Sequence, residues 1–147
     1  MRIMAENVNS KKWNKFNESL LTTCKLRDVD FFALRQWILS TMENLEKRDF
    51  EYFITSVTSP DEPNQIMSAT ILLENRLHSF GIEKNLKKRF FIIPIKIFVL
   101  YDEDIRPDFI KCTFGTSTEL SFFMEVPISN SEEVRAFCKK IRDLMWG

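Results

Sequence analysis

The apolar pattern is strongest in the second half of the chain. Residues 89–101 form a nearly continuous apolar run, which is typical of a strand buried on both faces. Residues 109–114 and 120–126 are two further apolar segments, and the last alternates apolar and polar positions as a half-buried strand does. The pattern therefore predicts three successive β-strands in this half.

Pro94 interrupts the longest apolar run. Because proline has no backbone N–H to donate to a sheet, we expect residues 90–93 to form a lead-in or bulge. The paired strand should then begin near Ile95. We expect residues 102–108 and 115–118 to form the turns that connect the three strands.

Helical spacing predicts two helices in the first half of the chain. The first apolar stripe comprises Trp13, Phe16, Leu20, Leu21 and Cys24. The second comprises Phe31, Leu34, Ile38, Met42 and Leu45. We expect Ser10 to cap the first helix and Asp28 or Asp30 to cap the second. The short connection predicts a helical hairpin, and polar residues 1–9 are expected to be flexible.

The middle of the chain is expected to run strand, loop, helix. Residues 50–57 are aromatic and β-branched, as in a strand, and residues 59–63 form a proline-containing loop. Residues 66–80 fit either a strand or a helix. Pro63 suits a first helical turn and Gly81 suits a helix end, so we predict a helix there. A right-handed parallel crossover would follow if the flanking strands share a sheet.

The C-terminal segment has the clearest helical pattern. Ser129, Asn130 or Ser131 is positioned to cap it. Its apolar face comprises Val134, Phe137, Cys138, Ile141, Leu144 and Met145. Together these patterns predict a single α+β domain over residues 1–147. It should contain an N-terminal helical hairpin, a mixed or mainly antiparallel sheet of about four strands, one internal helix and a C-terminal helix.

Composition narrows the class of protein. Basic and acidic residues are balanced at 21 each, which counts against a dedicated nucleic-acid-binding protein because such proteins usually carry a basic excess. Three cysteines without a C-x-x-C pair, and no secretory signal, predict reduced thiols and an intracellular location, cytoplasmic or nuclear. The apolar run 89–101 is too short to span a bilayer, so we expect no membrane partner.

Most catalytic motifs are missing. With three glycines and one histidine, the chain has no dinucleotide or Walker loop and no multi-histidine metal site, so no cofactor is expected. His78 follows Glu74 at the spacing of a helical surface pair. A nucleophilic pair would have to join His78 to Cys112 or Cys138. Both cysteines lie on apolar faces, where buried packing is the expected role.

An acidic turn is the most suggestive chemical feature. It contains Asp102, Glu103, Asp104 and Asp108. Carboxylates at strand ends are suitable ligands for Mg²⁺, so Asp102, Asp104 and Asp108 are an alternative metal site. The simpler interpretation is a solvated, charged turn between two apolar strands, in which case the turn holds no metal.

Two short segments near this turn are similar to a nuclease motif. Pro107-Asp108, followed by Glu119 and then Ser121, resembles the PD-(D/E)xK pattern. The resemblance implies a metal-dependent nuclease with Asp108 and Glu119 as catalytic residues. Ser121 stands where that motif has lysine, so a cation that would orient water or steady charge is missing. We therefore retain this function only as an alternative to a chain with no catalytic site.

A basic stretch and several aromatic residues form the candidate binding surface. The residues concerned are Lys84, Lys87, Lys88, Arg89, Phe109, Lys111, Phe123 and Trp146. The basic stretch suits phosphate binding, or it protects the following apolar strand from aggregation. The two sheet phenylalanines and the lysine between them suit base stacking, or packing in an interface. Trp146 either pins the chain end to the core or anchors a partner.

These observations favour a non-catalytic, intracellular protein-interaction or regulatory module. Such a module is an adaptor, an inhibitor, a chaperone-like binder or an assembly subunit. The 14 phenylalanines leave room for an aromatic-rich docking surface, and homo-oligomerisation is one use of it. A nucleic-acid-binding protein and a metal-dependent nuclease are the alternatives.

Overall fold

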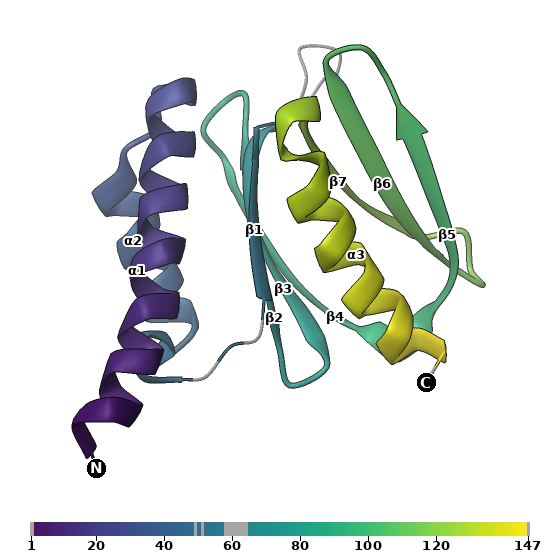
Figure 1. Cartoon of the computed structure of the whole chain (residues 1–147). Helices are drawn as coiled ribbons and strands as arrows, with labels where there is room; N and C mark the ends of the chain where they lie inside the picture. Colours follow the sequence, from purple (N-terminus) through teal and green to yellow (C-terminus); the bar gives the residue numbers. More distant parts are fainter. Residues whose placement is uncertain (1, 49, 51, 58–64, 147) are drawn as a thin grey trace.

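The computed structural model describes residues 2–48, 50, 52–57 and 65–146, and it confirms an α+β fold. Helices lie at both ends of the chain, and between them are two antiparallel sheets (Figure 1). The first sheet has four strands in the order β1-β2-β3-β4, and the second has three in the order β5-β6-β7. Each sheet is a meander, because strands that neighbour one another in space are consecutive in sequence.

The N-terminal helical hairpin is confirmed. It consists of α1 (Arg2–Arg27) and α2 (Phe31–Thr41), followed by a short 3-10 turn (Leu45–Lys47). Asp30 caps α2, because its Oδ1 accepts a hydrogen bond from the Ala33 N–H at 3.2 Å. Residues 2–9 were expected to be flexible, but they form the first turns of α1, so α1 begins well before Ser10.

The first sheet separates two apolar cores. Its strands are β1 (Tyr52–Val57), β2 (Gln65–Leu73), β3 (Arg76–Glu83) and β4 (Lys88–Pro94). On one face it packs against α1 and α2, in a core that includes Phe16, Leu20, Ile38, Met67, Ile71 and Phe80. On that side Thr23 of α1 donates a hydrogen bond to Thr55 of β1 at 3.0 Å.

The other face of the first sheet packs against the second sheet and the C-terminal helix (Figure 1). The elements on this side are β5 (Phe98–Ile105), β6 (Phe109–Thr116), β7 (Ser121–Pro127) and α3 (Ser131–Trp146). The second core includes Ile54, Leu72, Leu77, Phe114, Met124 and Phe137. The predicted apolar face of α3 is largely correct, since Val134, Phe137, Cys138 and Ile141 are buried.

The predicted internal helix is wrong. Residues 66–80 form β2, a tight turn and most of β3, and all contacts between the two strands are antiparallel. Glu74 and Asn75 make the turn with φ values of 54° and 60°, both in the left-handed region. No parallel crossover exists in the described residues. In addition, the described strands number seven in two sheets rather than about four in one.

The longest apolar run is also divided differently from the prediction. Lys88–Pro94 is paired as β4, so residues 90–93 belong to a strand and are not a lead-in. Ile95–Ile97 is a 3-10 turn rather than the start of the paired strand. Pro94 ends β4 at the edge of the first sheet, where a missing N–H costs little, and the chain then enters the second sheet as β5.

Candidate functional site

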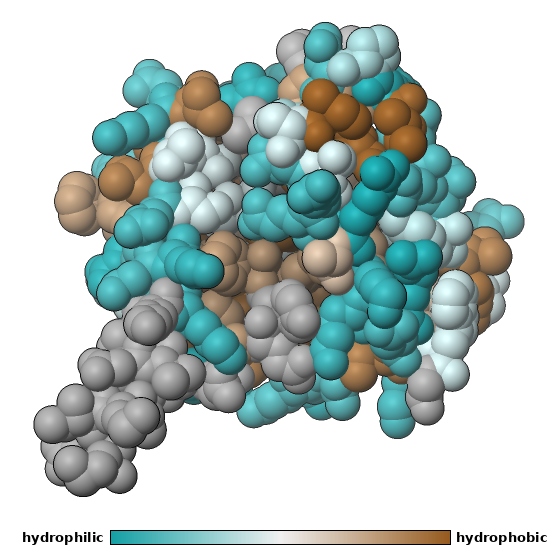
Figure 2. Space-filling model, in the orientation of Figure 1, coloured by the Kyte–Doolittle hydropathy of each residue, from teal (hydrophilic) through white to brown (hydrophobic). Residues whose placement is uncertain are grey.

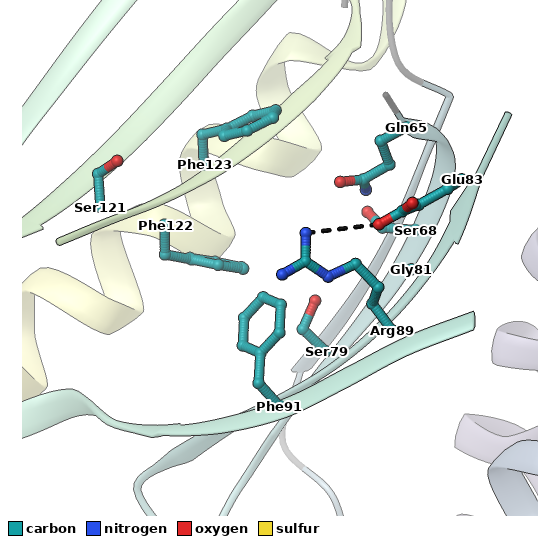
Figure 3. A pocket seen from close by; sticks show the side chains of 10 residues that line it. All are labelled: Gln65, Ser68, Ser79, Gly81, Glu83, Arg89, Phe91, Ser121, Phe122 and Phe123. Carbon is teal, nitrogen blue, oxygen red and sulfur yellow. Dashed lines mark ion pairs between the residues drawn. The ribbon is translucent and has the colours of Figure 1, made fainter. Parts of the chain in front are cut away.

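A cavity of about 230 Å³ lies between the two sheets, and we call it the inter-sheet pocket (Figure 3). Its lining comes from four strands and comprises Gln65, Ser68, Ser79, Gly81, Glu83, Arg89, Phe91, Ser121, Phe122 and Phe123. The first sheet supplies a mainly polar wall and β7 supplies most of the aromatic wall. The pocket therefore combines a hydroxyl-rich floor, one ion pair and several aromatic rings.

Small residues on neighbouring strands make the hollow. Ser68 on β2 lies opposite Gly81 on β3, and Gly81 in turn lies opposite Arg89 on β4. In the next row Thr70 lies opposite Ser79, and their hydroxyl groups are hydrogen bonded at 3.2 Å. These small side chains cannot fill the space between the sheets, whereas larger apolar residues do so further along the same face.

Arg89 is the central charged group of the pocket. Figure 3 shows its guanidinium group pointing into the pocket toward Phe91 and Phe122, and its Nη1 forms an ion pair with Oε1 of Glu83 at 3.4 Å. The Arg89 side chain is 67% exposed and the Glu83 side chain 20%, so the guanidinium group remains accessible from solvent. No second polar partner of Arg89 is recorded among the described residues.

Aromatic rings close one side of the pocket. Phe91 of β4 and Phe122 of β7 meet edge to face, with ring centroids 5.9 Å apart and planes at 79°. Phe122 is buried, but Phe91 is 41% exposed and stands at the open edge of the first sheet. The contact joins the two sheets beside Arg89, so a ligand there would touch both an aromatic surface and a cation.

The structure brings together part of the predicted binding surface. Arg89 and Phe123 line the same pocket, although they are far apart in sequence. Lys111 Nζ lies 4.3 Å from the centre of the Phe123 ring, a cation–π contact. One residue of the basic stretch, Arg89, and one of the sheet aromatics, Phe123, are therefore neighbours in space.

Other predicted binding residues lie apart from the pocket. Lys84 and Lys87 are exposed in the β3–β4 turn, and Lys88 has its Nζ 5.5 Å from the Trp37 ring centre, on the α2 side. Phe109 pairs with Pro127 at the far end of β6. Trp146 is 67% exposed at the end of α3, so it does not pin the chain end into the core.

The predicted carboxylate pair is not brought together. Asp108 precedes β6 and Glu119 lies in the turn after it, so a strand of roughly 25 Å separates them. Asp102 and Asp104 are exposed on β5, and Asp104 accepts a hydrogen bond from Arg106 at 3.1 Å. Within the part of the chain that the structure describes, no group of three or more acidic, cysteine or histidine side chains is placed to hold a metal ion.

A polar network ties β5 to α3. Arg135 donates two hydrogen bonds to Oε1 of Glu103, at 2.7 and 3.0 Å, and Tyr101 donates one to Oε2 at 2.9 Å. The Arg135 hydrogen bonds hold the pKa of Glu103 below its ordinary value. Glu103, part of the predicted acidic turn, is therefore a structural partner of α3.

Cys112 and Cys138 lie on the opposite side of the first sheet from His78. Cys112 and Cys138 are fully buried in the second core, and a hydrogen bond with Cys112 raises the pKa of Cys138. His78 lines a different hollow, next to Arg48 and Phe90 on the helical side. The structure therefore brings neither Cys112 nor Cys138 to His78, and Glu74 pairs with Arg48 at 2.6 Å instead of with His78.

The pocket floor is the part that sequence reasoning missed. Ser68, Ser79 and Gly81 carry no charge, and the helix predicted over residues 66–80 would have placed Ser68 and Ser79 about three turns apart. The available signal was the strand interpretation of residues 66–72. It places Ser68 and Thr70 on one face, as they are in β2.

Comparison with protein-family models, with curated proteins and with solved structures found no match to this chain. In the described residues, no helix has both the length and the apolar character needed to cross a membrane. The candidate functions below therefore rest on the geometry of the chain itself.

Proposed function

We propose that this chain is a non-catalytic protein-interaction module that acts inside the cell and binds a partner along the edge of β5. The observation that carries this proposal is an exposed apolar edge strand. Among the described residues β5 pairs only with β6, so its other side has unpaired backbone groups. Such an edge is a template for an added strand from another chain.

One end of the second sheet has several exposed aliphatic side chains, which we call the docking patch. It comprises Ile97, Val99, Leu100 and Leu120, which are 46%, 50%, 65% and 68% exposed. Figure 2 shows hydrophobic atoms on the side of the molecule where β5 lies. Most phenylalanines are used in the two cores, so the docking patch is aliphatic rather than the aromatic-rich surface that composition suggested.

Register places the patch residues at one end of the second sheet. Leu100 lies opposite Gly115, and Phe98 lies opposite Thr116. The Thr116 N–H donates to the Leu120 carbonyl at 2.9 Å, which brings Leu120 to the same end. Beyond the patch, β5 continues with Asp102 and Asp104, so a partner segment with an apolar half and a basic half would fit.

Affinity purification of the tagged protein from its source, with mass spectrometry of bound proteins, tests this proposal. Leu100→Lys places a charge in the docking patch and should remove a stoichiometric partner. Leu26→Lys is the matched control, because Leu26 is a 67% exposed leucine on α1, away from β5. The wild-type protein and the partner identified in this way, each purified, should form a complex, and Leu100→Lys should disrupt that complex.

Three other results would change the site, the partner or the function. A partner retained equally by Leu100→Lys and wild type would place the interface elsewhere. Light scattering that shows a dimer lost in Leu100→Lys would identify a second copy of this chain as the partner. A set of bound proteins that disappears on nuclease treatment would favour the second candidate function.

The second candidate is nucleic-acid binding, favoured by the proximity of Arg89, Phe123 and Lys111. Single-stranded nucleic acids bind where cations and exposed aromatic rings alternate. Such binding should weaken steeply as salt rises, because phosphate contacts release counterions. Reversing the charge of Arg89 and Lys111 should abolish it, and unchanged binding would exclude this function.

A further inference from the structure

We propose that the inter-sheet pocket is a binding site for a compact carboxylate ligand. The carboxylate would contact Arg89, and an apolar body of about the size of one aromatic ring would lie against Phe91 and Phe122. This site is separate from the docking patch. It does not depend on the function proposed above.

The hollow itself is the first argument for an occupant. Elsewhere between the sheets, apolar side chains fill the space, and leaving a core hollow reduces stability in proportion to its volume. Here Ser68 lies opposite Gly81 in one row, and Ser79 lies in the next row of the same face. Ser68 and Ser79 are almost fully buried, at 5% and 3% exposure, although serine is usually found at the surface.

The charge at the pocket is the second argument. Arg89 offers several N–H donors in a planar fork, which matches the two oxygens of a carboxylate. Glu83 contacts the fork only at 3.4 Å, so donors remain for a ligand. Arg89 is the cation that lines the pocket, and Glu83 is the one carboxylate among the lining residues.

Glu83 also limits the charge of the ligand. Its carboxylate compensates one positive charge beside Arg89, and its side chain is largely sheltered from water. A doubly charged phosphate would be repelled by it more strongly than a singly charged carboxylate would. The pocket is therefore better matched to a monoanion.

The volume sets the size of the apolar body. A cavity of about 230 Å³ is below the usual range of drug-sized sites, which is roughly 300–1,000 Å³. Phe91 and Phe122 already meet edge to face, and a third ring can extend such an arrangement. Benzoate has this combination of one carboxylate and one ring, so it is a suitable probe.

Gly81 provides a direct way to close the pocket. A methyl group built on Gly81 would lie 3.8 Å from the Arg89 carbonyl and from Gln65, which is ordinary van der Waals contact. Gly81 has no positive φ, so a side chain there brings no backbone strain. Gly81→Leu should therefore fill the cavity, and Gly81→Ala is the matched control that leaves most of it open.

The experiment is an amide NMR titration of the full chain with benzoate and with its neutral analogue benzamide, each up to about 10 mM. We expect benzoate to shift the amides of Ser79, Gly81 and Phe122. Benzamide should bind the wild-type protein at least about tenfold more weakly than benzoate does. The Arg89→Gln variant should bind benzoate at least about tenfold more weakly than wild type does. Gly81→Leu should lose the shifts and Gly81→Ala should keep them, and thermal unfolding checks that each variant is folded.

Two peptides distinguish the sources of the carboxylate. One ends in phenylalanine with a free C-terminal carboxylate, and the other is the same peptide amidated. If the free peptide binds at least about tenfold more tightly than benzoate, the ligand is the C-terminus of a protein. If benzoate binds as tightly as the free peptide, the ligand is a small organic acid.

Several outcomes would overturn the proposal. Equal binding of benzoate and benzamide, or undiminished binding to folded Gly81→Leu, would show that the pocket is not a carboxylate site. An absence of shifts with all four probes would do the same. A single-stranded oligonucleotide that shifts the same amides where benzoate does not would assign the pocket to nucleic acid. Leu100→Lys should leave benzoate binding unchanged, so failure of one proposal is distinguishable from failure of the other.

Discussion

His78 is a titratable residue that the fold partly removes from water. Its side chain is half-buried in β3 near Arg48, Glu74 and Arg76, and its Nδ1 is buried without a hydrogen-bond partner. Burial is the main reason why its pKa lies below the ordinary value of 6.5, and the two arginines lower it further. The Leu73 carbonyl and Glu74 offset only part of that decrease.

The pH dependence of stability should therefore report on His78. Between the folded pKa and 6.5 the unfolded chain binds more protons than the native chain, so the free energy of unfolding rises with pH. The contribution of neutral His78 is complete above 6.5 and is lost as the pH falls to the folded pKa. Urea unfolding at about pH 7.5 and pH 5.5 should show a lower midpoint at the lower pH.

His78→Gln should make that pH dependence flatter, because His78 is the only histidine in the chain. Glu103 titrates below the range of pH 5.5 to pH 7.5, because its pKa lies below the ordinary value of 4.5. An unchanged difference between the two midpoints in His78→Gln would assign the effect to another group.

At the scale of single elements, the β2–β3 hairpin explains why the sequence was misinterpreted. In β2, Met67, Ala69 and Ile71 alternate with Ser68 and Thr70, but this alternation covers only five residues, because apolar residues stand on both sides of it. The same spacing of Ile66, Ala69 and Leu73 also fits one face of a helix. Periodicity alone cannot separate these cases. The Glu74-Asn75 turn lacks glycine, so the usual hairpin signal was weak as well.

Substitution in this turn tests the hairpin. Asn75 has φ 60°, which asparagine and glycine tolerate and β-branched residues do not. Asn75→Gly should leave the free energy of unfolding unchanged or raise it, and Asn75→Val should lower it by about 1–2 kcal/mol. Urea unfolding gives both values. Equal stability of the two variants would mean that the turn does not have this left-handed geometry.

At the scale of the whole molecule, α3 holds the two sheets together. Phe137 is 1% exposed in a core that takes residues from both sheets, whereas Trp146 on the same helix is 67% exposed. The amphipathic pattern of α3 was sufficient to predict its buried face. The arrangement of seven strands in two sheets was not predictable, because nothing local shows that the chain leaves one sheet and enters another after Pro94.

Truncation of Phe137 should show how strongly the two halves are coupled. Phe137→Ala should lower the free energy of unfolding by about 3–5 kcal/mol, because it leaves a cavity between the sheets. Trp146→Ala should change it by less than about 0.5 kcal/mol. Chemical unfolding followed by fluorescence measures both. A similar loss in the two variants would contradict the burial difference along α3.

The meander order of the strands has a consequence for synthesis on the ribosome. All strands of the first sheet precede the second sheet in the chain, so α1, α2 and β1–β4 can fold while the rest is still being translated. During that interval Ile54, Leu72 and Leu77 face water, because the elements that cover them have not yet emerged. Nascent chains that stall at this stage should aggregate or recruit chaperones. These apolar side chains are covered only when the second sheet and α3 have been made.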